Sequence, residues 1–306
     1  MNKYFYTFLI AIIFSFFSCI KEYQVFYPYK NTGLSYLNQL QPRAKVLKFH
    51  NDSLFTYTSE SGLTVNIKEN SFEDVNGMIS LHIENPDSQG DYIADRISFE
   101  NQNKTLISGY NVISFYFTDD LGNHPILKKD ALIEFKIPFG EIKIPAIYKF
   151  FNDKWTEEFI SNENFKKTTW EVITGEEPIL QKGYIFKTKE EGKYCLGTPI
   201  ERQANVENLS VSLPKGFDVN NSIVQINYSD LNTNIEMFWD GENKTFQLPT
   251  GLKIPDNEAS IIILSENAES QPFFGMKSVF IQQGESISID VNKKTIDDIK
   301  NILNEL

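Results

Sequence analysis

Apolar and polar residues alternate one by one along most of the sequence from Leu54 onward. This period of two is typical of β-strands that bury one face, and Leu63, Val65 and Ile67 form one such series. Ile261–Leu264 is continuously apolar instead, as expected for a central strand that is buried on both faces. The sequence therefore predicts an all-β fold.

The length of 306 residues predicts two domains, because a typical domain has roughly 150 residues. We expect two β-sandwich modules in tandem, followed by a short C-terminal helix. The expected boundaries are an N-terminal signal peptide over residues 1–18, a tether over 19–50, a first sandwich with extra strands over 51–203 and a second sandwich module over 204–306.

The C-terminal helix is predicted from its first residues. Thr295 and Asp298 have the spacing of a capping box, with aspartate in place of the usual glutamate. The apolar residues after this cap share one face, which we expect to lie against the second sandwich. They are Ile296, Ile299, Leu303 and Leu306.

The charge of the chain argues against one broad class of function. There are 29 basic and 41 acidic side chains, and the formal net charge is −12. Nucleic-acid binding needs a concentrated positive surface that displaces counterions from phosphates, so no nucleic-acid partner is expected. The hydrophobic fraction of 41% and the charged fraction of 23% are those of a globular protein.

The N-terminus has the pattern of an export signal. One lysine precedes an apolar run over residues 4–17, which is shorter than the roughly 20 residues that a membrane-spanning helix needs. The stretch that ends at Cys19 resembles a bacterial lipobox, which implies an acylated thiol held in a lipid bilayer. Lys21 and Glu22 resemble the short signal that sends some Bacteroidetes lipoproteins to the cell surface. An ordinary signal peptide is the alternative to the lipobox. A plain polar tether is the alternative to the surface signal at Lys21 and Glu22.

Cys195 is the one cysteine besides Cys19, so the exported domains have no internal disulfide. It alternates with Tyr194 and Leu196, and no histidine or asparagine motif accompanies it. We interpret Cys195 as a small core residue on a strand rather than a nucleophile.

Turn motifs separate the strands. Asn76-Gly77 predicts a tight hairpin. Asp119–Asn123 is interpreted as a turn rather than a calcium loop, because it lacks a bidentate glutamate. Gly183–Phe186 and Tyr194–Leu196 are expected to pair as a further hairpin, and Arg202–Val206 is the expected linker between the domains.

The order of several motifs within residues 54–150 resembles that of ZU5-like β-sandwich domains, and similar modules occur in Bacteroidetes surface lipoproteins. The resemblance implies a non-catalytic binding or scaffolding module. Tyr110 departs from the pattern, in which a second glycine follows Gly109. Convergent turn chemistry among β-sandwiches is the alternative. The motifs are Gly62–Ile67, Ser71-Phe72, Asn76-Gly77, Leu106–Gly109, Asp120–Gly122 and Ile133–Pro138.

Residues that could carry catalysis are few. His50, His82 and His124 are not at metal-ligand spacing, and no nucleophile elbow or phosphate-binding glycine loop is found. Adjacent acids such as Glu190-Glu191 would point to opposite faces if they lay on a strand, so they cannot act together on one glycosidic bond. We expect such pairs in solvated loops. We therefore expect no catalytic residues, no metal and no cofactor, and the protein is not expected to be an enzyme.

Aromatic residues are the better lead for binding, because flat apolar rings can stack on sugars or anchor a protein partner. Trp239, Phe273 and Phe274 are the candidate contact residues, and Pro272–Gly275 is interpreted as a loop. Trp155 and Trp170 could belong to such a platform as well. The alternative is that most of these rings belong to the core.

The expected function combines these patterns. We expect an outer-membrane lipoprotein, anchored through acylated Cys19, that acts as a non-catalytic binding or scaffolding component of the cell envelope. The cell surface is the expected location, with the periplasmic face as the alternative. A surface glycan-binding lipoprotein of a polysaccharide-uptake system is the second hypothesis, and a hydrolase is the third.

Overall fold

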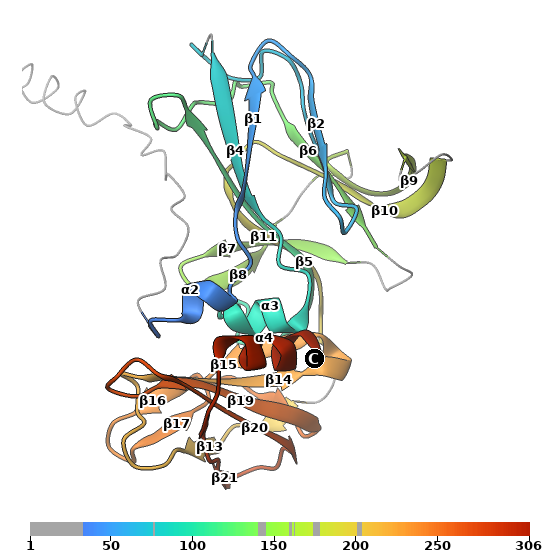
Figure 1. Cartoon of the computed structure of the whole chain (residues 1–306). Helices are drawn as coiled ribbons and strands as arrows, with labels where there is room; N and C mark the ends of the chain where they lie inside the picture. The colour runs from blue at the N-terminus through green and yellow to red at the C-terminus, as the bar shows by residue number, and fades with distance from the viewer. Residues whose placement is uncertain are drawn as a thin grey trace, which may run out of the picture.

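The structure is a computed structural model that describes residues 33–75, 77–139, 145–158, 161, 163–173, 178–200 and 204–306. The expected signal peptide, Cys19, Lys21, Glu22 and Asn76 of the expected hairpin lie outside these residues. In the described part, two β-sandwiches stand in tandem, and three short helices lie where they meet (Figure 1). The expected all-β class, the tandem sandwiches and the C-terminal helix are confirmed.

The first sandwich packs a six-stranded antiparallel sheet against a five-stranded one. Across the larger sheet the strands are β1 (Lys45–His50), β4 (Met78–Glu84), β5 (Ile107–Asp119), β11 (Gly192–Pro199), β7 (Ala146–Phe151) and β8 (Lys154–Glu157). Across the smaller sheet they are β2 (Phe55–Thr58), β3 (Thr64–Ile67), β6 (Ile133–Pro138), β10 (Pro178–Thr188) and β9 (Phe165–Ile173).

The alternation in the sequence places every second side chain of these strands in the core. Leu63, Val65 and Ile67 are fully buried and face Leu81 and Phe117 of the larger sheet within one cluster. Burial of apolar area stabilises the fold by roughly 25 cal/mol per Å². Because the domain has no disulfide, this burial is its main source of stability.

The second sandwich contains a four-stranded and a five-stranded sheet. The four-stranded sheet has the order β16 (Phe238–Asp240), β17 (Thr245–Gln247), β13 (Leu209–Ser212) and β21 (Glu285–Ser288), with β13 and β21 parallel. The five-stranded sheet has the order β15 (Thr233–Glu236), β14 (Ser222–Tyr228), β19 (Glu258–Glu266), β20 (Pro272–Phe280) and β22 (Asn292–Lys293). A separate pair joins β12 (Ala204–Val206) to β18 (Ile254–Pro255), and a single 3-10 turn follows β14 at Ser229–Leu231.

The central strand β19 is buried on both faces, as its apolar run predicts. Ile261 and Ile263 belong to the core of the second sandwich. Ile262 and Leu264 face the other way and are covered by a layer of helices.

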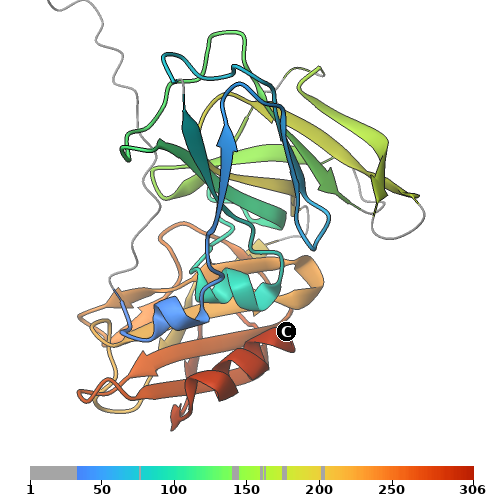
Figure 2. The same ribbon diagram turned by 45° about the horizontal axis from the view of Figure 1, so that its top comes forward.

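Three helices form that layer between the sandwiches (Figure 2): α2 (Leu37–Leu40), α3 (Gln89–Ala94) and α4 (Ile296–Asn304). The Thr295–Asp298 capping box is present at the start of α4, and Ile299 and Leu303 pack onto the second sandwich, so both predictions for this helix are confirmed. Gly90 brings α3 close to α4, because a Cβ at this position would lie 2.3 Å from the Leu303 carbonyl oxygen.

The prediction of a tether over residues 19–50 is wrong for its second half. Leu34, Leu37 and Leu40 are buried in the helical layer, and β1 forms six cross-strand pairs with β4. Pro42 ends α2 but does not prevent the strand that follows, because β1 is stabilised by pairing with a strand far along the sequence.

Three local predictions are also wrong. Gly183–Phe186 and Tyr194–Leu196 do not pair, because β10 and β11 belong to opposite sheets. The expected loop at Pro272–Gly275 is the beginning of β20, paired with β19. Of the expected linker, Ala204–Val206 forms β12, and residues 201–203 lie outside the described part.

Candidate functional site

The contact between the two sandwiches is buried and hydrogen-bonded. The Gln225 side-chain amide donates to the Ile93 carbonyl at 2.8 Å, and the Asn234 amide donates to the Ile97 carbonyl at 2.9 Å. In return, the Phe99 backbone N–H donates to the Asn234 carbonyl at 2.8 Å. Gln225 and Asn234 are at most 1% exposed. A buried polar group is costly without its partners, so this network favours one fixed arrangement of the two domains.

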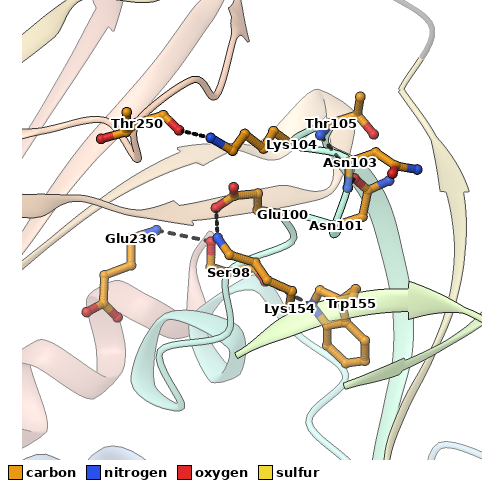
Figure 3. Close-up of polar contacts among 10 residues, drawn as sticks. All are labelled: Ser98, Glu100, Asn101, Asn103, Lys104, Thr105, Lys154, Trp155, Glu236 and Thr250. Atoms are coloured by element: carbon orange, nitrogen blue, oxygen red, sulfur yellow. Dashed lines mark hydrogen bonds and ion pairs between the residues drawn. The ribbon is translucent and has the colours of Figure 1, made fainter. Parts of the chain in front are cut away.

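The segment from Ser98 to Thr105 makes polar contacts with both domains, as Figure 3 shows. The Trp155 indole N–H donates to the Ser98 carbonyl at 2.8 Å, and Lys154 forms an ion pair with the buried Glu100. On the other side, the Lys104 ammonium donates to the Thr250 carbonyl of the second sandwich at 2.7 Å.

A pocket of about 350 Å³ opens beside this segment. Two lysines lie on it, but Lys104 is bonded to Thr250 and Lys253 pairs with Glu207 at 2.5 Å. Lys253 is thus already paired with a carboxylate, whereas Lys104 donates one hydrogen bond to a neutral carbonyl and keeps its charge. The lining residues are Asn103, Lys104, Thr105, Leu106, Ile200, Gly251, Lys253 and Pro255.

The outer face of the six-stranded sheet carries a ladder of rings that the sequence does not predict. His82 and Tyr116 are stacked with ring centroids 4.3 Å apart, and the ring centroids of Tyr116 and His124 are 5.8 Å apart. His82 also bonds to Thr118 at 2.9 Å. Burial lowers the pKa of His82, and the charge of His124 adds to this effect.

Glu191 contacts His124, the last ring of this ladder. Its carboxylate accepts the Phe117 backbone N–H at 2.9 Å and lies 3.1 Å from His124 Nδ1. The side chain is 15% exposed, so the expectation of a solvated Glu190-Glu191 pair is wrong for Glu191. Burial raises the pKa of Glu191, because the charged carboxylate loses hydration there.

Three partly buried charged side chains influence one another here: Glu84 of β4 and Lys193 of β11 in the same sheet, and Asp95 at the end of α3. Lys193 lies 5.9 Å from the centre of the Phe150 ring, and the charges of Asp95 and Glu84 act on it. Burial lowers the pKa of Lys193 and raises that of Glu84. Burial also raises the pKa of Asp95 to about 7. This mixture of donors and acceptors could bind a polar ligand. Within the described residues, however, no group of His, Cys, Asp or Glu side chains is suited to hold a metal ion.

The raised pKa of Asp95 predicts a dependence of stability on pH. The folded state binds the proton more tightly than the unfolded chain, whose aspartate has the ordinary pKa of 3.8. The free energy of unfolding therefore falls as pH rises from 3.8 to about 7. The Asp95 side chain retains some contact with water, which screens the effect and makes it smaller than the full pKa shift would give. We therefore expect Asp95→Asn to remove roughly 2 kcal/mol of this fall. Urea unfolding at pH 4.5 and 7.5 measures the difference. Asp120→Asn at an exposed turn is the control, and an equal pH dependence in both variants would contradict the assignment.

The predicted contact aromatics do not form one surface. Phe274 is buried beneath the helical layer, so its assignment as a contact residue is wrong. Trp239 packs on Phe246 in one sheet of the second sandwich, and Phe273 packs on Phe217 at the other sheet. Trp155 and Trp170 are core residues. The sequence pattern missed the phenylalanine rings that are exposed in the described part of the chain, which are Phe151, Phe238 and Phe280.

Two interpretations of single residues are confirmed. Cys195 is 1% exposed on β11, and burial raises the pKa of its thiol to about 12, so it is not a thiolate nucleophile at neutral pH. Asp119 closes a turn, because its carboxylate accepts the backbone N–H groups of Leu121 and Asn123 at 2.9 and 2.8 Å.

Comparisons with protein-family models, with curated proteins and with solved structures found no match for this chain. Within the described residues, no helix is both long enough and apolar enough to cross a bilayer.

Proposed function

We propose that this protein is an exported lipoprotein that acts as a non-catalytic binding or scaffolding component of the cell envelope. Acylated Cys19 would hold it in the outer membrane, with the domains on the cell surface. The observation that carries the proposal is the buried interface between the sandwiches. A network with Gln225 and Asn234 fully enclosed supports a rigid body that presents fixed surfaces to partners.

The position of α2 supports a short connection to the bilayer. The Ser35 backbone N–H and hydroxyl both donate to the Glu266 carboxylate, at 2.8 and 2.7 Å. The start of the described chain is thus fixed to the second sandwich, and a chain from Cys19 to Leu34 spans at most about 50 Å even when fully extended. An anchored protein of this kind would therefore keep α2 within about 50 Å of the membrane surface.

The glycan-binding alternative receives less support. It rests on a shared aromatic platform of Trp239, Phe273 and Phe274. Phe274 is buried, and the other two rings lie on different sheets. We therefore propose binding or scaffolding without assigning a sugar as the ligand.

Two measurements on cells test the anchor and the location. We expect the wild-type protein to incorporate labelled palmitate and Cys19→Ala to incorporate none, because the thiol is the acylation site. Protease treatment of intact cells is then expected to digest the wild-type protein while a periplasmic control protein stays intact. Equal labelling of both forms would refute the anchor. Digestion only after the outer membrane is opened would place the domains on the periplasmic side.

A further inference from the structure

The longest free strand edge among the described strands belongs to β9. This strand ends the five-stranded sheet of the first sandwich and pairs only with β10. Figures 1 and 2 show the β9–β10 hairpin projecting from the body of the protein. β9 has nine residues, whereas β1, the next longest strand at a sheet end, has six. A free edge exposes unpaired backbone N–H and C=O groups, and most proteins keep such edges short.

The edge of β9 is regular enough to accept another strand. Its register with β10 runs from Phe165 to Ile173 without a shift, and the strand contains no proline. A bulge or a proline would prevent further pairing, and β9 has neither.

Lys167 and Glu171 are both exposed and lie on the same face of β9. They are four residues apart, which corresponds to about 13 Å along a strand, so they cannot pair with each other. Neither forms an ion pair with another described residue. As far as the structure describes the chain, both charges are therefore available to a partner strand.

Two-fold symmetry gives these charges a partner. If β9 pairs antiparallel with β9 of a second copy, centred on Thr169, each Lys167 lies opposite Glu171 of the other copy. Moving the centre by one residue would place Lys167 opposite Thr169 or opposite residue 173 and leave the charges unmatched. We propose that two copies of this chain associate through antiparallel pairing of β9 centred on Thr169, which joins their five-stranded sheets into one continuous sheet.

Exposed apolar side chains beside β9 agree with this arrangement. Ile179 and Leu180 of β10 are 57% and 63% exposed and lie opposite Val172 and Glu171. In the paired state, the lysines at 166 and 167 of the second copy lie across from the same two β9 residues. Their methylene stems extend over the apolar side chains of β10 while the ammonium groups stay in water.

Disulfide formation at the symmetry axis tests the proposal. Directly opposed residues of antiparallel strands have Cα atoms about 4.5–5.5 Å apart, which suits a disulfide. We therefore expect Thr169→Cys in the purified full chain, kept in mild detergent, to form a covalent dimer on oxidation. Thr56→Cys is the matched control, because Thr56 is exposed on β2 at the opposite end of the same sheet. The dimer yield at position 169 should exceed that at position 56 by about tenfold.

Exchange of the charges tests the register. Combined with Thr169→Cys, either K167E or E171K places like charges opposite each other and should lower the dimer yield by about tenfold. The double variant K167E/E171K should restore it, and a mixture of the two single variants should cross-link with each other. Equal yields at positions 169 and 56 would overturn the association. A yield that ignores the charges would overturn the Thr169-centred pairing. The lipid anchor plays no part, so its failure would leave this result unchanged.

Discussion

Replacement of Gly109 by alanine is expected to lower the free energy of unfolding by about 3 kcal/mol or more, at the upper end of the cost of overpacking a core. An added Cβ would lie 1.9 Å from the Phe99 ring. Phe99 cannot move aside, because it is fully buried and packs edge-on against Tyr92 at 5.1 Å. Its backbone N–H is also bonded to Asn234 of the second sandwich. Urea unfolding followed by circular dichroism measures the loss.

The position of Gly109 makes its substitution a test of the domain contact as well. The Gly109 backbone N–H donates to the Asn232 carbonyl at 2.9 Å, so a displaced Phe99 would also disturb the bonds between the sandwiches. We expect faster proteolysis between the domains. Gly241→Ala is the control, because its nearest neighbour would lie 3.8 Å from the added Cβ. Equal stability of the two variants would contradict the packing described for Gly109.

Trp155→Ala is expected to cost about 3–5 kcal/mol, as for other large buried rings. The Trp155 side chain is fully buried, lies 6.1 Å from the Phe99 ring and 5.1 Å from the Phe150 ring, and donates its indole N–H to Ser98 (Figure 3). The substitution leaves a cavity and an unpaired carbonyl under the segment that joins the domains. Thermal and urea unfolding measure the cost.

Trp155→Phe separates the two contributions. The phenyl ring retains most of the apolar contact but cannot donate to the Ser98 carbonyl. We expect this variant to lose about 1–2 kcal/mol, the cost of one buried acceptor left without its donor. A loss as large as that of the alanine variant would mean that the hydrogen bond, rather than the buried ring, stabilises this segment.

The strands and the fold class follow from the sequence because alternation is a local property. Leu63–Ile67 shows its buried face in five residues, and the capping box at Thr295 marks the start of α4. Pairing between strands is not local. The turn near Glu190 joins strands of opposite sheets, although the flanking residues look like a hairpin. Sequence spacing does not tell a hairpin from a crossing between sheets when the connection is this short.

The ladder of rings on the outer face of the six-stranded sheet could not be predicted either, because it depends on the pairing between strands. His82 and Tyr116 are cross-strand partners in β4 and β5, which the register alone brings together. His124 reaches them from the loop after β5.

The sequence pattern misassigns Phe274 because Pro272 and Gly275 look like loop residues. A strand that borders β19 overrides this local preference, and Gly275 fits there because a Cβ would lie 2.6 Å from the Asp290 carbonyl oxygen.

The helical layer has a consequence for the order in which the parts of the protein fold. Leu37 of α2 packs in one cluster with Ile299 and Leu303 of α4, so this layer needs residues from both ends of the chain. Because synthesis begins at the N-terminus, α2 has no complete docking surface until the last few residues have been made. Loss of the last residues would loosen the N-terminal end of the body, far away in sequence.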